Sequence, residues 1–341
     1  MRQVPVLLSA NFDVAQVEAI RSADPAIVLH GEEGGYAFEP PSGLDEMEIT
    51  YPRFRPDVDL DPILQSVEVI IASRLPRGIN ARAPHIRWVQ YVGAGLDHLM
   101  PVDELERARY VITNLSGVHA IPLAETVLTM MLTHVKSWSL FHDQQRRHIW
   151  QRHVIHELHG KTVGIIGLGR IGAEIARVCS YLGMRVLGIR RGDPTDVPVD
   201  HVAQVFSRSQ LHTMLAASDF VVCSAPATPE TYHMLGEAEL RRMKSTAYLI
   251  NVGRGQLVDE PILVRALAEG WIAGAGLDVF EQEPLPEGSP LWDMPNVFVL
   301  PHQGSDTFRY LDRGIDLICE NLRRYVEGSP LLNVVDPSRG Y

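Results

Sequence analysis

Three charged residues of different types each follow a predicted strand in the second half of the chain. Arg254, Glu283 and His302 come just beyond three successive apolar runs of strand length. Histidine titrates near neutral pH and can transfer a proton, a carboxylate can orient an imidazole, and a guanidinium binds an anion with paired hydrogen bonds. Ligands of open α/β sheets bind outside the carboxyl ends of the strands, so we expect the three side chains at one rim. One histidine among 14 carries little information, but three such groups in this order indicate proton transfer on an anionic ligand.

A glycine-rich loop follows a predicted strand and opens a predicted helix. Gly167, Gly169 and Gly172 form a GxGxxG pattern. Gly167 permits a tight turn, Gly169 lets the backbone approach a pyrophosphate, and Gly172 lets the helix pack closely on the strand. The first turn of the helix offers free N–H groups to phosphates. This context predicts a dinucleotide-binding loop, with a purely structural turn as the alternative.

The residues after the next predicted strand, 185–189, indicate which nucleotide binds. Proteins that bind NAD carry an acid about 20 residues beyond the loop, where it holds the ribose 2′-hydroxyl. This chain has Arg190 and Arg191 there, and no acid before Asp193. Two guanidiniums suit a 2′-phosphate, so we predict a preference for NADP(H), with NAD(H) as the second choice. A solvated surface pair is the other interpretation of the arginines.

Length and composition limit the class of protein. The 341 residues suffice for about two domains, and 45% hydrophobic and 21% charged residues predict a globular chain. No apolar stretch is long enough for a membrane span, and the N-terminal apolar run is too short for a signal peptide. A net charge of −11 argues against binding to nucleic acid or anionic membranes. Cys179, Cys223 and Cys319 lie far apart, which predicts no disulfide and no zinc site, as in cytoplasmic proteins.

The apolar runs predict two α/β domains. Unbroken runs separated by helical stretches are typical of doubly wound parallel sheets, and we expect five or six such strands in the second domain. The predicted strands are 4–8, 26–29, 67–72, 87–91, 162–166, 185–189, 220–224, 247–252, 273–277 and 297–300. Helical spacing predicts one long helix from Ile121 to about His148, whose apolar face is core or subunit interface.

A last helix at about 306–327 is followed by an extended tail that is too short for a domain. We expect this tail to pack on the first domain. The predicted architecture is a dinucleotide-binding Rossmann domain, residues 114–301, inserted into a flavodoxin-like substrate domain, residues 1–113 plus 302–341.

Five linked motifs between about residues 90 and 305 resemble the D-isomer-specific 2-hydroxyacid dehydrogenase family, which includes D-lactate dehydrogenases, phosphoglycerate dehydrogenase and glyoxylate/hydroxypyruvate reductases. The motifs are 117–125, 160–172, 226–231, 251–255, and 276–280 together with Glu283-Pro284. Residues 1–85 match the family only in general layout.

The resemblance implies roles for the three charged residues. His302 would be the general acid in reduction and the base in oxidation, because a proton must accompany hydride transfer at the substrate C2. Glu283 would orient the imidazole and raise its pKa. Arg254 would bind the substrate carboxylate and polarise the carbonyl group, for which lysine lacks the bidentate geometry.

The resemblance also implies contacts around these residues, and no metal site. Asp278 resembles an acid near the nicotinamide carboxamide, and its alternative role is a strand-end cap. The predicted cofactor contacts are Gly167, Gly169, Arg170, Ile171, Gly172, Arg190, Arg191, Ala225, Pro226, Thr231, Val252, Gly253, Arg254, Asp278, His302 and Gly304. The predicted substrate contacts are Arg74, Leu75, Gly93, Ala94, Gly95, Arg254 and His302.

The sequence therefore predicts an NADPH-preferring reductase of small 2-oxo acids that forms D-2-hydroxy acids, with glyoxylate and hydroxypyruvate as the favoured substrates and a homodimer as the assembly. The run 303–307 after His302 departs from the family pattern and leaves the pocket shape open. Two alternatives stay open, a nucleotide-sensing corepressor of the same fold and a phosphite dehydrogenase. A formate enzyme is disfavoured because Glu283 supplies the acidic partner that such enzymes lack.

Overall fold

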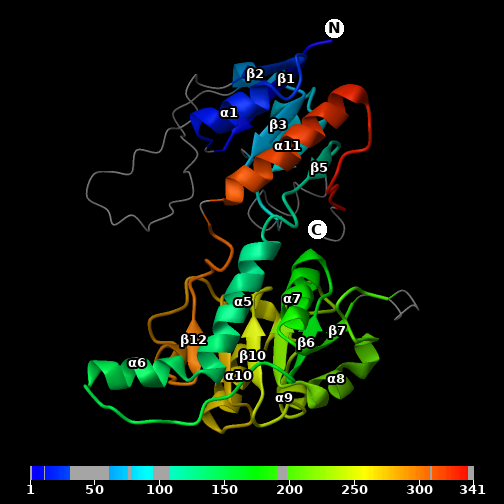
Figure 1. The fold of residues 1–341 in the computed structure, drawn as a ribbon. Helices are drawn as coiled ribbons and strands as arrows, with labels where there is room; N and C mark the ends of the chain where they lie inside the picture. Colours follow the sequence, from blue (N-terminus) through cyan, green and yellow to red (C-terminus); the bar gives the residue numbers. More distant parts are fainter. Residues whose placement is uncertain are drawn as a thin grey trace. The chain divides into compact units, whose positions relative to one another are not determined.

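The computed structural model describes residues 2–10, 12–30, 61–75, 78–94, 108–190, 198–307 and 309–336. Contacts divide the chain into two compact units (Figure 1): unit 1 is Met1–Val118 with Phe308–Tyr341, and unit 2 is His119–Thr307. The sequence predicts the two domain boundaries after residues 113 and 301. Each predicted boundary lies a few residues before the one in the structure. Hydrogen bonds explain the difference, since Leu115 N donates to Gly93 O (2.8 Å) within unit 1 and His302 N donates to Asp278 O (2.9 Å) within unit 2.

Unit 1 contains a parallel sheet with the order β2-β1-β3-β4-β5, the flavodoxin order. Its strands are β1 (Val4–Ser9), β2 (Ile27–His30), β3 (Val69–Ala72), β4 (Trp88–Tyr91) and β5 (Val111–Thr113). Its helices are α1 (Val14–Arg21), α2 (Asp61–Leu64), α3 (Ile79–Arg82) and α11 (Tyr310–Glu327). Two clusters of buried apolar side chains fill the unit, and α11 contributes to one of them.

The C-terminal tail returns to unit 1. Thr113 in β5 forms an antiparallel bridge with Val334, and Val335 N donates to Ile112 O at 2.8 Å. The tail therefore extends the sheet edge after α11 and closes the unit.

Unit 2 contains a parallel sheet with the order β12-β11-β10-β9-β6-β7-β8. The order reverses between β6 and β9, which is the Rossmann arrangement and places a ligand crevice at that point. The strands are β6 (Thr162–Ile166), β7 (Arg185–Ile189), β8 (Gln204–Phe206), β9 (Phe220–Cys223), β10 (Tyr248–Asn251), β11 (Gly274–Leu277) and β12 (Val297–Val299). The sheet has seven strands, whereas the sequence predicts five or six. The strand β8 was missed because it is only three residues long.

Helices cover both faces of the unit 2 sheet (Figure 1). Alternate residues of β10 face different cores, since Leu249 belongs to one buried cluster and Ile250 to the other. The helices are α5 (Ala120–Val135), α6 (Trp138–Arg146), α7 (Arg170–Tyr181), α8 (Leu211–Ala217), α9 (Glu237–Leu240) and α10 (Glu260–Ala268), with short 3₁₀ turns η2 (Arg208–Gln210), η3 (Gly255–Leu257) and η4 (Pro290–Trp292).

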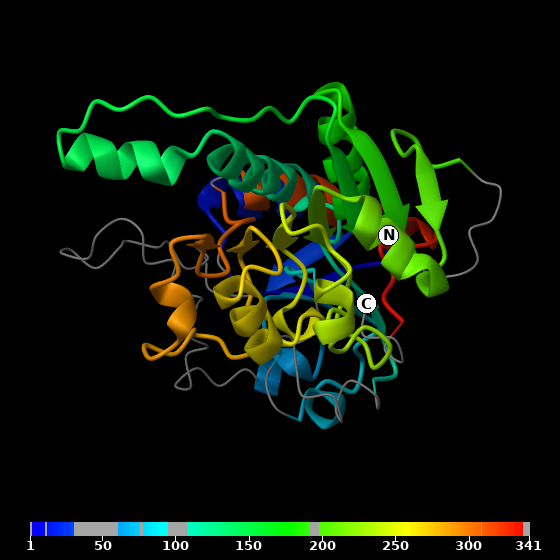
Figure 2. The ribbon, with the colours of Figure 1, turned by 90° about the horizontal axis from the view of Figure 1, so that it is seen from below.

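The single helix predicted from Ile121 to His148 was wrong, because it is two helices. α5 ends at Val135 and α6 starts at Trp138. Ser137 between them has a φ of 51°, in the left-handed region that a continuing helix excludes. α6 and the extended segment after it project from the body of unit 2 (Figure 2). Within the described residues, no helix is long and apolar enough to cross a membrane.

Candidate active site

The residues predicted to do chemistry in unit 2 follow the carboxyl ends of its parallel strands. The glycine loop follows β6, Arg190 follows β7, and Ala225 and Pro226 follow β9. Arg254, Asp278 and His302 follow β10, β11 and β12. Because every pairing in this sheet is parallel, these residues share one rim.

The glycine loop has the backbone that its spacing predicts. Gly167 has a φ of +103°, and a Cβ there would lie 2.7 Å from Ala225 N. A Cβ on Gly172 would lie 2.1 Å from Gly167 O, so only glycine lets α7 approach β6 this closely. A Cβ on Gly169, by contrast, would meet nothing within 4 Å. Gly169 is the residue before α7, so open space lies at this helix N-terminus, where free N–H groups can receive a phosphate.

The other predicted nucleotide contacts surround this loop. Arg170 and Ile171 form the first turn of α7. Arg190 is the residue after β7, and Arg191 lies outside the described residues. Thr231 closes a turn after β9, because its hydroxyl donates to Pro226 O at 2.7 Å and accepts from Thr228 N at 2.8 Å.

A buried asparagine shapes the turn that carries Arg254. Asn251 Nδ2 donates to Arg254 O at 2.9 Å, and Gly253 N donates to Asn251 Oδ1 at 3.1 Å. The next residue, Gly255, fits tightly, since a Cβ on it would lie 1.9 Å from Phe280 C. Val252 and Gly253 are buried and Arg254 is half-buried, so this turn packs against the segment that leads to Glu283.

Asp278 fixes the loop that carries His302. Its buried carboxylate accepts from Gln303 N and from Gly304 N, both at 2.9 Å. A Cβ on Gly304 would lie 2.7 Å from Asp278 Oδ2, so a larger residue would displace the carboxylate that holds this loop. Burial raises the pKa of Asp278, although the two N–H groups and the charge of His302 act in the opposite direction. His302 itself has a φ of 53°, a conformation that this anchored loop imposes.

His302 and Glu283 form a hydrogen-bonded pair. His302 Nδ1 lies 2.7 Å from Glu283 Oε2, and the other carboxylate oxygen accepts from Phe280 N at 3.0 Å. The hydrogen bond to Glu283 raises the pKa of His302, helped by the charges of Glu283 and Asp278 and opposed by burial and by Arg254. For Glu283, burial acts to raise the pKa, but the hydrogen bonds from His302 and Phe280 outweigh it and the pKa is lowered. The pair therefore favours an imidazolium facing a carboxylate.

The charge of His302 acts on two further residues, which were not among the predicted site residues. The pKa of Asp306 is raised, because burial outweighs the opposing charge of His302. Burial, followed by the charges of Arg254 and His302, lowers the pKa of His119 to about 4. His119 lies within the motif 117–125, so the sequence held a signal for it, whereas Asp306 lies in the run that departs from the family pattern.

The remaining predicted substrate residues lie in unit 1, at the carboxyl ends of β3 and β4. Arg74 is exposed and Leu75 is buried. Gly93 O accepts from Leu115 N at 2.8 Å, and Ala94 O accepts from Asn114 Nδ2 at 2.6 Å. Gly95 lies outside the described residues.

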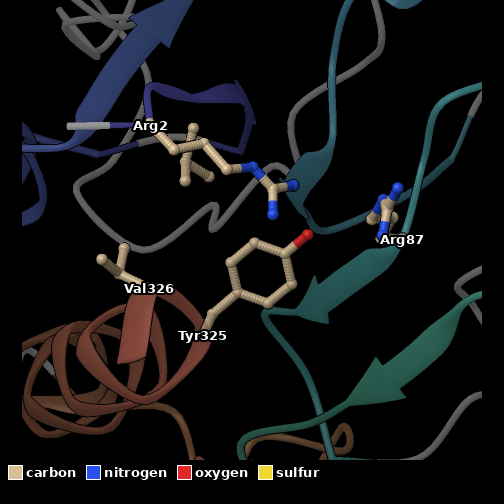
Figure 3. Close-up of a pocket in the computed structure, with 5 residues that line it drawn as sticks. Arg2, Arg87, Tyr325 and Val326 are labelled. Carbon is tan, nitrogen blue, oxygen red and sulfur yellow. The ribbon is translucent and has the colours of Figure 1, made fainter. Parts of the chain in front are cut away.

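Unit 1 also contains a cavity of about 320 Å³ at the opposite edge of its sheet (Figure 3). Strands β1 and β4 begin beside it, which places it at the amino edge, away from the predicted substrate residues. It is lined by Arg2, Val4, Arg87, Tyr325 and Val326. In the described part of the chain, no cluster of three or more His, Cys, Asp or Glu side chains is arranged to hold a metal ion.

Comparison with solved structures supports the fold. A D-isomer-specific 2-hydroxyacid dehydrogenase from Xanthobacter autotrophicus Py2, solved with NADPH and MES, is 32% identical with a TM-score of 0.78, and all of both chains is covered. The NADPH-dependent glyoxylate/hydroxypyruvate reductase from Sinorhizobium meliloti, solved with NADP and sulfate, is 25% identical with a TM-score of 0.77, covering 99% of this chain and 100% of that one.

Comparison with curated proteins and family models identifies the family. The glyoxylate reductase of Korarchaeum cryptofilum is 38% identical over 264 residues, which are 74% of this chain and 77% of the relative. The glyoxylate/hydroxypyruvate reductase B of Pectobacterium carotovorum is 35% identical over 284 residues, 81% and 88% of the two chains. Residues 128–304 match the model of the D-isomer specific 2-hydroxyacid dehydrogenase NAD binding domain. The chain is an oxidoreductase that belongs to the D-isomer-specific 2-hydroxyacid dehydrogenase family.

Proposed function

We propose that this enzyme reduces small 2-oxo acids, with glyoxylate and hydroxypyruvate as substrates, to D-2-hydroxy acids and uses NADPH as the preferred reductant. The observation that carries the proposal is the His302–Glu283 pair, with its 2.7 Å hydrogen bond, on the rim that also carries Arg254 and the glycine loop. Curated relatives named glyoxylate reductase and a neighbour solved with NADP support the choice of substrate and cofactor.

The glycine loop fits a dinucleotide. The open space at Gly169, beside the N-terminus of α7, can receive a pyrophosphate, while the tight contacts at Gly167 and Gly172 fix the loop around it. Arg190 and Arg191 would bind the 2′-phosphate of NADP(H), a group that NAD(H) lacks. When bound, the nucleotide supplies or accepts the hydride.

The three charged side chains have separate tasks. Arg254 binds the substrate carboxylate, and its permanent charge polarises the neighbouring carbonyl group. His302 Nε2 donates a proton to the C2 oxygen during reduction, because its Nδ1 is occupied by Glu283. Glu283 holds the ring and keeps it protonated at higher pH, which raises the fraction of enzyme ready to act as an acid. Asp278 acts one step further away, because it positions His302 through the loop 302–304.

The two units divide these tasks. Unit 2 would hold the nucleotide and the acid–base pair, and unit 1 would contribute substrate contacts from Arg74, Leu75 and the loop that starts at Gly93. The enzyme would work in the cytoplasm, where its three buried thiols stay free.

The assembly we propose is a homodimer formed through the arm, defined as residues 138–155. The arm leaves and rejoins unit 2 at one place, because His156 N donates to Val135 O at 2.9 Å. Most of its apolar side chains are exposed, with Trp150 at 98% and Val154 at 91%. Exposed apolar surface of this kind marks a protein interface, and a second copy of the chain is the partner that buries both arms.

Light scattering tests the assembly. Trp150→Arg should shift the protein from dimer to monomer, whereas Val14→Arg, at an exposed valine of unit 1, should leave the dimer intact. A wild-type monomer, or a dimer that tolerates Trp150→Arg, would contradict this assembly.

Turnover tests the proposed activity. A panel of 2-oxo acids is assayed with NADPH and with NADH, and we expect turnover of glyoxylate and hydroxypyruvate in the ordinary range, about 1–10³ per second. Nucleotide binding without turnover of any 2-oxo acid would favour a nucleotide-sensing role instead. Equal kcat/KM with the two nucleotides would remove the assigned role of Arg190 and Arg191.

A further inference from the structure

The segment that carries Glu283 is joined to a second histidine, His233. His233 Nε2 lies 2.5 Å from Glu281 Oε1, and Glu281 comes two residues before Glu283. A carboxylate only accepts hydrogen bonds, so the ring nitrogen of His233 is the donor. Phe280 N, directly before Glu281, donates to the carboxylate of Glu283 at 3.0 Å. The contact with His233 therefore adjoins the hydrogen bond that holds Glu283 in place.

Glu281 also ties this segment to the start of α10, where two more acids lie. Glu281 N donates to Glu260 Oε2 at 3.1 Å, and Glu260 N donates to Glu281 Oε1 at 3.4 Å. Burial raises the pKa of Glu260, the N–H of Glu281 opposes this, and the negative charge of Glu281 adds to the rise. Asp259, the N-cap residue of α10, places Oδ2 3.6 Å from His233 Nδ1. His233 thus supplies positive hydrogen atoms where three carboxylates gather and repel one another.

The backbone and the ring of His233 are both held. Its ring stacks on that of Tyr232, with centroids 4.0 Å apart and an angle of 16° between the planes. Its backbone N donates to Gln256 O at 2.8 Å. The φ of His233 is 47°, in the left-handed region that glycine adopts at lower cost. A side chain that is kept at such a position points to a task for the imidazole itself.

We propose that His233 is a positioning residue for the acid–base pair, which it serves by holding the segment 280–283 through Glu281. The inference rests on the proposed function, in which the protonated ring of His302 delivers the proton. Without the hydrogen bond from His233, repulsion from the neighbouring acids would displace Glu281 and loosen the segment. Glu283 would then contact His302 Nδ1 for a smaller fraction of the time, and the pKa of His302 would fall toward its ordinary value of 6.5.

The pKa of His302 reports this effect directly. It is measured by NMR titration of the enzyme labelled at histidine, in which the signal of His302 is the one that is absent from His302→Ala. We expect the pKa in His233→Leu to lie about half a unit below that of wild type, because the contact with Glu283 is weakened and not lost. The alkaline limb of kcat/KM for glyoxylate should move toward acid by the same amount, since reduction needs the protonated ring.

Two control variants separate positioning from other effects. In His233→Gln the amide can still donate to Glu281 but carries no charge, so the His302 pKa should stay near wild type. A matched pair lies elsewhere in unit 2, where His212 Nε2 of α8 is 2.8 Å from Glu239 Oε1 of α9. This pair lines the same cavity of about 340 Å³ as His233. His212→Leu should therefore leave the His302 pKa and the pH–rate profile unchanged.

A double variant shows whether His233 acts through Glu281. If it does, adding His233→Leu to Glu281→Ala should leave the His302 pKa where Glu281→Ala alone places it. Tm is measured for every variant, and His233→Ala replaces the leucine variant if leucine impairs folding, with the same expected shift.

The outcomes are distinguishable. A His302 pKa that is unchanged in His233→Leu, even with a lower Tm, would overturn the positioning role, and so would an equal fall in His233→Gln or full additivity in the double variant. A wild-type enzyme that reduces no 2-oxo acid would overturn the proposed function, whereas the NMR titration would still decide whether His233 holds Glu283 against His302.

Discussion

Replacing Glu283 with glutamine should move the alkaline limb of the pH–rate profile for 2-oxo acid reduction by about one pH unit toward acid. In the wild-type enzyme the carboxylate of Glu283 lies 2.7 Å from His302 Nδ1 and raises the pKa of the imidazole above its ordinary value of 6.5. Reduction needs the protonated ring, so activity is retained below this raised pKa and is lost as the pH rises through it. The amide of glutamine can still accept a hydrogen bond from Nδ1 but carries no charge.

The size of the displacement follows from the geometry. A hydrogen bond to a charged group contributes about 1.5–3 kcal/mol, which corresponds to about one to two pH units. His302 and Glu283 are 40% and 36% exposed, so water screens the pair and the lower end applies. Asp278 and Arg254 still act on the ring in the variant, with opposite signs.

The assay measures kcat/KM for glyoxylate across pH, which reports the pKa of the free enzyme. In the oxidation of the D-2-hydroxy acid the ring must be neutral, so the variant should gain activity relative to wild type at acid pH. Glu283→Gln profiles that coincide with wild type in both directions, or that move toward alkali, would refute the assigned role of Glu283.

Three further predictions concern the anion-binding groups and the glycine loop. Arg254→Lys should raise KM for the 2-oxo acid and lower kcat while NADPH affinity stays near wild type, because lysine lacks the paired geometry; a fall in nucleotide affinity alone would count against it. Gly172→Ala should destabilise the protein by about 1–3 kcal/mol in chemical denaturation, because its Cβ would lie 2.1 Å from Gly167 O; Gly169→Ala, whose Cβ meets nothing within 4 Å, should leave stability unchanged but weaken nucleotide binding. Arg190→Ala should lower kcat/KM for NADPH by about ten- to hundredfold with little change for NADH, and equal effects on both would argue that it does not read the 2′-phosphate.

Much of the fold follows from local patterns in the sequence. β6 and β7 occupy the predicted ranges 162–166 and 185–189. Each strand coincides with an apolar run of strand length, one before the glycine loop and one after the helix that the loop opens. β5 and β8 were not predicted, since three-residue strands such as Val111–Thr113 leave too short a pattern. The break between α5 and α6 was also missed, because the apolar spacing continues through Ser137 and only the backbone conformation of that residue ends the helix.

The parts of the candidate site that depend only on the place of a residue after a strand were predictable from the sequence. Arg254, Asp278 and His302 come directly after strands, so the rule for parallel sheets predicts a common rim without any knowledge of packing. The effect of Arg254 and His302 on His119 could not be predicted in this way. It depends on the packing of α5 against a distant loop, which is visible in the hydrogen bond between Thr126 and Gly304, 178 residues apart. The roles of these residues in binding and catalysis stay predictions.

The most direct measurement is the kcat of His302→Ala for reducing glyoxylate and hydroxypyruvate with saturating NADPH, in protein whose Tm and NADPH affinity match wild type. If the imidazole paired with Glu283 delivers the proton to the C2 oxygen, kcat falls by about 10²–10⁴-fold. A variant that keeps kcat within about threefold of wild type would contradict the assignment of His302 as the acid.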